Sequence, residues 1–148
     1  ISLERPDIDA QAVEAAARYV YANDFIEQLP DTYDFQLQSN GSNLSAGQGQ
    51  LIAFARAIAS GSEVIMLDEA TSAVDSVTER LIQKAIDHVF EEKTVIAIAH
   101  RLSTIQHSDE ILLLDGGKII ERGDHKYLMA SQGFYANLVQ QLDNGEQS

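Results

Sequence analysis

Residues 64–69 read Val-Ile-Met-Leu-Asp-Glu, four apolar side chains followed by two adjacent carboxylates. Such a run predicts a buried strand of a parallel sheet, and carboxylates at its carboxyl end lie where α/β folds bind ligands. Asp68 there can hold Mg²⁺, which prefers oxygen ligands and keeps part of its hydration. Glu69 points to the other side of the chain and can polarise an attacking water. An apolar strand before a solvated acidic turn is also common, so the run alone leaves a purely structural role open.

The residues after this run predict a strand–helix–strand unit. Ser76 and Glu79 have the spacing of a capping box, so a helix should begin there, and residues 94–99 predict a second apolar strand. Because both strands are apolar throughout, we expect a parallel sheet covered on both faces. Residues 110–121 then predict a hairpin that turns at residues 115–117, Asp-Gly-Gly.

The first third of the chain is predicted to be helical. Apolar residues recur at helical spacing after Asp9, a predicted N-cap, and a second helix starts at Ser45. The composition then changes to the strand–helix–strand pattern. We therefore divide the chain into a helical region, residues 1–62, and an α/β region, residues 63–148, which ends in a helix over about residues 134–142.

Composition and charge exclude several classes of function. The 148 residues include no cysteine, which removes disulfides, thiolate metal sites and cysteine nucleophiles. The net charge of −13 leaves no basic patch, so we expect no nucleic-acid partner. No apolar run approaches the roughly 18–20 residues that span a bilayer, and no signal peptide is visible. Because the chain opens with Ile1 rather than Met, we expect it to begin within a longer protein or after processing.

The run Leu44-Ser45-Ala46-Gly47-Gln48 comes just before the second helix and allows two interpretations. Ser45 and Gln48 have capping-box spacing, which favours an ordinary helix start. A helix N-terminus also offers free N–H groups and a positive dipole end to an anion. In that interpretation Ser45 adds a hydroxyl, and Gly47 lets the backbone approach a phosphate without a Cβ in the way.

A histidine directly follows the second apolar strand. His100 therefore falls at the same edge of a parallel sheet as Asp68 and Glu69. Its ring can contact a terminal phosphate and orient a water molecule. A single histidine after a strand is more often structural, so His100 indicates a function only in combination with the other motifs.

The order and spacing of these motifs resemble the ATP-binding cassette (ABC) family over about residues 3–142. LSAGQ resembles the signature motif, usually LSGGQ, and His100 falls at the switch histidine. Residues 68–72 resemble the Walker B motif with its catalytic glutamate, and residues 72–75 resemble the D-loop, usually SALD. The segment at 99–104, Ala-His-Arg-Leu-Ser-Thr, looks like the exporter form of the family.

This resemblance implies a fold and a division of roles within the chain. The fold is the C-terminal part of an ABC ATPase domain, with a helical subdomain carrying the signature over residues 1–62. Residues 63–148 are then the C-terminal half of a RecA-like, parallel-sheet α/β core. The implied cofactors are ATP and Mg²⁺, with Glu69 and His100 catalytic and Asp68 at the metal. The implied nucleotide-contacting residues are Leu44, Ser45, Ala46, Gly47, Gln48 and Asp75.

The resemblance also implies partners. Two cassettes of the family meet head to tail, so the signature here would contact ATP held by a second nucleotide-binding domain, identical or not. Asp75 would lie at the seam between the two domains. A transmembrane domain would contact the cassette through its coupling helices, at the cytoplasmic face of the cell membrane.

The sequence departs from the family in three places. It has no G-x-x-x-x-G-K-[ST] loop to cradle phosphates, since its one Gly-Lys pair, Gly117-Lys118, lacks that spacing. We therefore expect this chain alone to bind ATP weakly and to be inactive. Ala46 stands where glycine is usual in the signature. Ser39 stands where exporters often carry a glutamate that faces the coupling helices.

Three functions follow from these observations. The favoured one is ATP hydrolysis that powers substrate export across a membrane. A soluble ABC ATPase acting on chromosomes or ribosomes is an alternative, which the acidic charge and the 99–104 segment disfavour. A degenerate cassette acting as a regulatory partner is another, which Ala46 and Ser39 favour and the presence of Glu69 and His100 disfavours.

Overall fold

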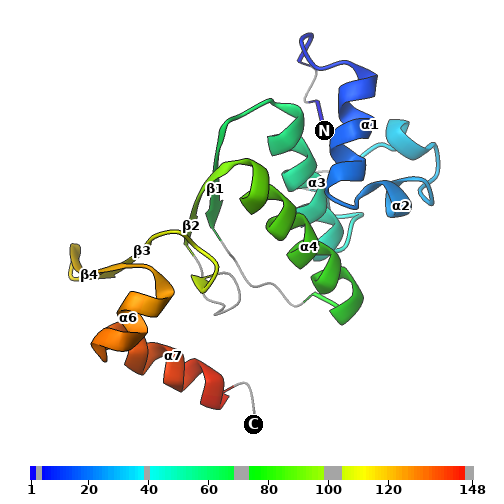
Figure 1. Ribbon diagram of the computed structural model, residues 1–148. Coiled ribbons are helices and arrows are strands. Elements are labelled where there is room, and N and C mark those ends of the chain that lie inside the picture. Colours follow the sequence, from blue (N-terminus) through cyan, green and yellow to red (C-terminus); the bar gives the residue numbers. More distant parts are fainter. Residues whose placement is uncertain (3–4, 39–40, 69–73, 99–104, 146–148) are drawn as a thin grey trace. The chain divides into compact units, whose positions relative to one another are not determined.

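The computed structural model describes residues 1–2, 5–38, 41–68, 74–98 and 105–145 (Figure 1). Its contacts fall into two compact units, Ile1–Ala97 and Ile98–Ser148, each with its own apolar core. The mixture of helices with parallel and antiparallel strands is the α/β class expected from the sequence. None of the helices in the described residues is long and apolar enough to cross a membrane. The predicted division into a helical region, residues 1–62, and an α/β region, residues 63–148, is a different boundary from the one between these two units, and it stays a prediction.

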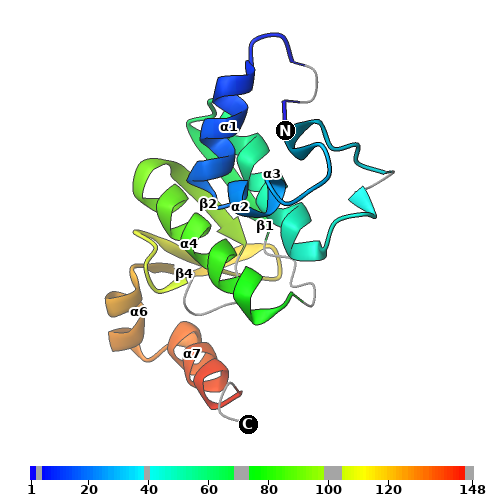
Figure 2. The same cartoon turned by 90° about the vertical axis from the view of Figure 1, so that its right-hand side faces the viewer.

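The first unit combines helices with a two-stranded sheet. In chain order its elements are α1 (Ala10–Tyr19), α2 (Asn23–Ile26), the 3₁₀ turn η1 (Thr32–Asp34), α3 (Ala46–Ala59), β1 (Val64–Asp68), α4 (Ser76–Glu92) and β2 (Thr94–Ile98). Helix α3 packs against both α1 and α4, as the two views show (Figures 1 and 2). Leu51 and Ala55 of α3 meet Val20 and Ala85 there, and all four side chains are buried. The short side chains of Ala55 and Ala85 leave room for the larger ones in this core.

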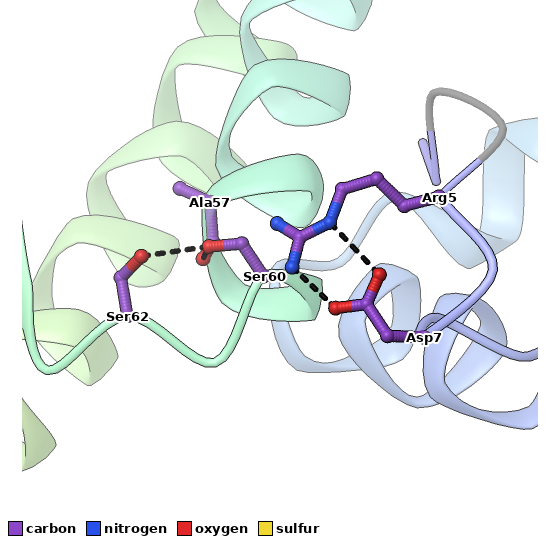
Figure 3. A network of polar contacts seen from close by, with 5 residues as sticks. All are labelled: Arg5, Asp7, Ala57, Ser60 and Ser62. Carbon is purple, nitrogen blue, oxygen red and sulfur yellow. Dashed lines mark hydrogen bonds and ion pairs between the residues drawn. The ribbon is translucent and has the colours of Figure 1, made fainter.

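The helix ends follow local side-chain chemistry. Asp9 caps α1 by accepting the N–H of Ala12 at 2.7 Å, which confirms the predicted N-cap. Helix α4 begins at Ser76 as predicted, but the predicted cap is wrong, because the carboxylate of Asp75, and not the hydroxyl of Ser76, caps that helix. At the far end of α3 the Ser60 hydroxyl donates to the carbonyl of Ala57 at 2.7 Å, and Figure 3 shows this contact in the same view as the Arg5–Asp7 ion pair.

The sheet of the first unit consists of β1 and β2, which are hydrogen-bonded neighbours. The N–H of Thr94, the first residue of β2, donates to the carbonyl of Glu63, just before β1, at 3.1 Å. The two strands therefore start side by side and run parallel, with α4 as the crossover between them. Their carboxyl ends, at Asp68 and Ile98, lie at the same edge of the sheet.

Only one face of this sheet is covered by the described residues. Ile65 is 6% exposed and Leu67 packs against the helical core, whereas Met66 between them is 79% exposed. The expectation of a sheet buried on both faces is therefore wrong for this chain. The apolar run carries side chains for two covered faces, and in the part of the first unit that the structure describes helices cover one. The open face bears Val64 and Met66 from β1 and Ile96 and Ile98 from β2.

The second unit is a hairpin followed by two helices. Its elements are β3 (Ile111–Asp115), β4 (Lys118–Gly123), α6 (His125–Ser131) and α7 (Phe134–Gly145). The predicted hairpin is confirmed: Asp115 pairs with Lys118, and Gly116 and Gly117 have φ of 53° and 75°, which glycine adopts without strain. No helix was predicted at the position of α6. Its Leu128 packs with Ile111, Tyr135 and Val139 in the core of this unit.

Helix α7 is capped by a side chain from another element. The carboxylate of Glu121 on β4 accepts the N–H of Phe134 at 2.6 Å and the N–H of Tyr135 at 2.9 Å. Gly133 precedes the helix, and its carbonyl accepts the N–H of Asn137 at 3.2 Å. A Cβ on Gly133 would collide with the Glu121 carboxylate, 2.8 Å from its Cδ atom. This glycine is what allows the carboxylate to reach the helix end.

Candidate functional site

The first turn of α3 is built by the LSAGQ residues. Ser45 is the N-cap, with its Oγ accepting the N–H of Gln48 at 3.2 Å, and Gln48 Oε1 accepts the N–H of Ser45 at 3.0 Å. The predicted capping box is therefore present. Leu44, just before it, packs against the helical core and fixes where the helix enters. Ser45 and Ala46 are exposed, so the outer side of this turn faces solvent.

The capping box leaves hydrogen-bond donors for a ligand. A serine hydroxyl has one donor and two acceptor positions, and the cap uses only an acceptor of Ser45. Likewise Gln48 gives its carbonyl oxygen to the cap, which leaves its amide NH₂ as a donor. Helix geometry adds the N–H groups of Ala46 and Gly47, which have no intrahelical acceptor, whereas that of Gln48 already donates to Ser45. The two interpretations of this run are therefore compatible, because the cap does not use these remaining donors.

Gly47 faces away from solvent, against α4. It is buried, and a Cβ built on it would collide with the methyl carbon of Thr78 and lie 2.8 Å from Cγ1 of Val74. Gly49 lies two residues further along α3, and a Cβ built on it has nothing within 4 Å. Close approach of a phosphate, the reason the sequence suggested for Gly47, stays a prediction. The structure supplies an additional reason, since α4 occupies the space where a side chain would point.

The first turn of α4 lies on the other side of this contact. Asp75 accepts the N–H of Val77 at 3.1 Å and that of Thr78 at 2.9 Å. These hydrogen bonds, led by that from the Thr78 backbone and followed by hydrogen bonding from the Thr78 side chain, hold the pKa of the Asp75 carboxyl below its usual range. Asp75 is exposed and therefore negatively charged at neutral pH. The structure thus brings the signature turn and the D-loop aspartate together through Gly47 and Thr78.

At the carboxyl edge of the β1–β2 sheet, the described part of the predicted site is Asp68. Asp68 ends β1 and is exposed, so its carboxylate fits a role as one oxygen ligand of a Mg²⁺ ion that keeps waters in its other positions. Glu69 and His100 lie outside the described residues, as do residues 72 and 73 of the D-loop and Ser39. Among the residues that the structure describes, no group of three or more His, Cys, Asp or Glu could hold a metal.

Sequence reasoning missed Thr78 and Val74. Thr78 belongs to no motif, and Val74 was noted only as part of the D-loop; the importance of both comes from their contact with Gly47, which is distant in the sequence. One signal was available: a glycine within a segment of residues that otherwise favour a helix suggests that another element packs closely against it. That signal could not name the neighbour.

Comparison with known proteins gives a consistent result. A family model described as "ABC transporter" matches residues 4–72. An "ATP-dependent lipid A-core flippase" of Chromohalobacter salexigens is 50% identical over 140 residues, which cover 95% of this chain and 24% of the flippase. A protein of the same name from Pseudomonas syringae pv. tomato is 52% identical over 126 residues, covering 85% of this chain and 21% of that protein.

A solved structure is similar over most of the chain. The "Structure of a bacterial Atm1-family ABC exporter with ATP bound" superposes with a TM-score of 0.80 and 39% sequence identity, covering 93% of this chain and 24% of that one. The chain therefore spans about a quarter or less of the length of these proteins.

Proposed function

The chain belongs to the ABC transporter family as the C-terminal part of an exporter-type nucleotide-binding domain, and from this premise we propose that it supplies half of an ATP-hydrolysing engine for export across a membrane. Members of this family use ATP. The observation that carries the proposal is the α3 start, where Ser45 and Gln48 cap the helix and keep donors free for phosphate oxygens.

We propose the following roles for the residues that would contact the nucleotide. Leu44 to Gln48 form a phosphate-binding turn for ATP held by a second nucleotide-binding domain. Ser45 and Gln48 donate from their side chains, Ala46 and Gly47 offer backbone, and Leu44 anchors the turn in the core. Asp75, held in its charged form by the N-terminus of α4, faces the seam between the two domains. Because anions are stabilised at helix N-termini, ATP itself would draw the two domains together.

Hydrolysis is proposed at the edge where β1 and β2 end. A water oxygen attacks the γ-phosphorus, the bond to the β–γ bridging oxygen breaks, and Glu69 accepts the proton of the water. His100 orients that water, and Asp68 would hold Mg²⁺, which would supply positive charge to offset that of the phosphates. The parallel β1–β2 pair supports this assignment, since it brings the strands that lead to these residues to one edge.

The partners and location follow from the exporter relatives. We propose that a transmembrane domain contacts this cassette through coupling helices, and that the cassette lies at the cytoplasmic face of the cell membrane. No nucleic-acid partner is proposed, because the chain carries 23 acidic against 10 basic side chains.

Substitution of Glu69 tests the catalytic assignment. In the full-length protein encoded by the gene, Glu69→Gln should lower kcat for ATP hydrolysis about a hundredfold or more, because the proton acceptor is lost. Binding of ATP should change little. Glu63→Gln, the same exchange at the other end of β1, is the matched control and should retain activity. A loss below about tenfold for Glu69→Gln would exclude this residue as the base.

A degenerate regulatory cassette is the second candidate, and one observation favours it. Ala46 is exposed on the face of the turn that would meet a phosphate, where the family has glycine. Ala46→Gly separates the two functions in the full-length protein. An active site should show similar turnover with either residue, whereas a degenerate one should gain ATPase activity with glycine.

A further inference from the structure

Thr78 touches both of the elements that the proposed function assigns to the domain seam. It lies in the first turn of α4, half-buried, and it belongs to no motif of the family resemblance. Its methyl group occupies the space beside Gly47 in the signature turn. Its backbone N–H donates to the Asp75 carboxylate at 2.9 Å. One residue therefore contacts the phosphate-binding turn on one side and the charged seam residue on the other.

The contact with Gly47 is too tight to be incidental. The Thr78 methyl and Val74 Cγ1 together fill the position of a Cβ on Gly47, so the backbone of α3 rests directly on α4. Close-packed contacts of this kind resist displacement, because overlap in one direction and a void in the other both cost energy. The first turns of α3 and α4 are therefore expected to shift together rather than independently.

We propose that Thr78 is a positioning residue that locks the Ser45–Gln48 turn to Asp75, so that phosphate binding at the turn moves the aspartate with it. This inference rests on the proposed function and extends it. In a head-to-tail pair each domain carries one such lock, which gives each ATP a direct mechanical connection to the seam. Thr78 does not itself contact nucleotide or the reacting atoms.

The experiment is a clash-and-rescue series in the full-length protein. Gly47→Ala places a Cβ against the Thr78 methyl and should lower kcat/KM at least about tenfold. Thr78→Ser removes that methyl while keeping the hydroxyl and the backbone donor. If the lock is real, Gly47→Ala/Thr78→Ser should regain activity relative to Gly47→Ala. If Gly47 matters only for the approach of phosphate, the serine cannot help and the double variant stays as poor as the single one.

A second pair of variants keeps the proposal testable if Gly47→Ala does not fold. Thr78→Ser loosens the Gly47 side, and Thr78→Val keeps a methyl there while removing the hydroxyl near Asp75. Both should reduce the cooperativity of ATP hydrolysis, measured as a Hill coefficient closer to one, with melting temperatures near that of wild type. Unchanged cooperativity in both variants, or a loss explained wholly by lower melting temperature, would overturn the lock.

Two controls separate failure of this inference from failure of the proposed function. Gly49→Ala adds the same methyl on the same helix, where nothing lies within 4 Å, and should behave as wild type. Wild-type protein that hydrolyses no ATP at all would refute the proposed function. Active wild type with no rescue of Gly47→Ala would refute the lock alone.

Discussion

Helices α3 and α7 both begin at a capped end with a tightly placed glycine, yet their caps are assembled in opposite ways. At α3 the cap is local: Ser45 and Gln48 bond to each other's backbone, and Gly47 packs on apolar atoms of α4. At α7 the cap comes from β4, where Glu121 accepts two N–H groups across the space that Gly133 leaves open. The local cap leaves side-chain donors for a ligand, whereas at α7 a carboxylate already occupies the position that an anion would take. Only the first is therefore suited to bind an anion.

The strongest test of this contrast is removal of the α7 cap. Glu121→Ala in the 148-residue chain should destabilise the second unit by about 2–3 kcal/mol, since hydrogen bonds to a charged acceptor are lost and the helix start is left open. Urea unfolding followed by tyrosine fluorescence would measure the change. Glu110→Ala, which breaks only the exposed pair with Arg122, should have a much smaller effect. Equal effects of the two variants would mean that the carboxylate does not cap α7.

The next test concerns the glycine beside that cap. Gly133→Ala should cost about 1–3 kcal/mol, because its methyl displaces the Glu121 carboxylate from the helix. In a Glu121→Ala background the same change should cost little, since the carboxylate is already absent. The coupling energy from this double-mutant cycle is the measurement. Additive costs would show that Gly133 is needed for its backbone alone.

The local cap should be weaker. Ser45→Ala in this chain should cost about 1 kcal/mol, the usual value for an N-cap hydroxyl, because Gln48 still satisfies one backbone group. Ser45→Thr keeps the hydroxyl and is the matched control. A cost as large as that of Glu121→Ala would remove the distinction between the two helix ends.

The smallest effect is the pH dependence of the α4 cap. Hydrogen bonds in the folded state hold the pKa of Asp75 below its ordinary value of 3.8. Its contribution is therefore fully present above that value and is lost as pH falls through the lower, folded-state pKa. The stability difference between wild type and Asp75→Asn should accordingly shrink below about pH 4. A difference that stays constant down to pH 2 would contradict the cap.

A further test follows from the missing phosphate loop. Isothermal titration of the 148-residue chain with Mg–ATP should show no binding at micromolar concentrations, because the chain supplies the acidic side of the site and no G-x-x-x-x-G-K-[ST] cradle. Asp68→Asn removes one of those carboxylates and serves as the comparison. Micromolar affinity in the wild-type chain would contradict the proposed roles.

The sequence predicted features whose partners are close in the chain. The Asp9 cap, the Ser45–Gln48 box and the glycine turn of the hairpin each depend on residues within a few positions of one another, and each is confirmed. The spacing of Ser76 and Glu79 predicts a cap by Ser76, whereas Asp75 caps α4, since both of these adjacent residue types can cap a helix. Spacing alone does not predict which of two such neighbours caps the helix.

Features that join distant elements were not predictable in this way. The Glu121 cap and the Gly47–Thr78 contact depend on how strands and helices pack, which no local pattern encodes. The prediction that both faces of the β1–β2 sheet are covered was wrong for a related reason. An apolar run shows that a strand can be buried, but it does not show whether another element covers each face. Of the candidate site, the described part comprises Leu44–Gln48, Asp68 and Asp75, while Glu69 and His100 rest on sequence.

The open face of the β1–β2 sheet makes the solubility of this chain depend on its charge. Two such faces lose water-exposed apolar area when they meet, which is favourable, and the net charge of −13 is what keeps the molecules apart. That repulsion reaches about 10 Å in 0.1 M salt and about 3 Å in 1 M salt. Salt should therefore turn a clear solution of this chain into a clustered one, and light scattering would rise before the circular dichroism of the folded chain changes.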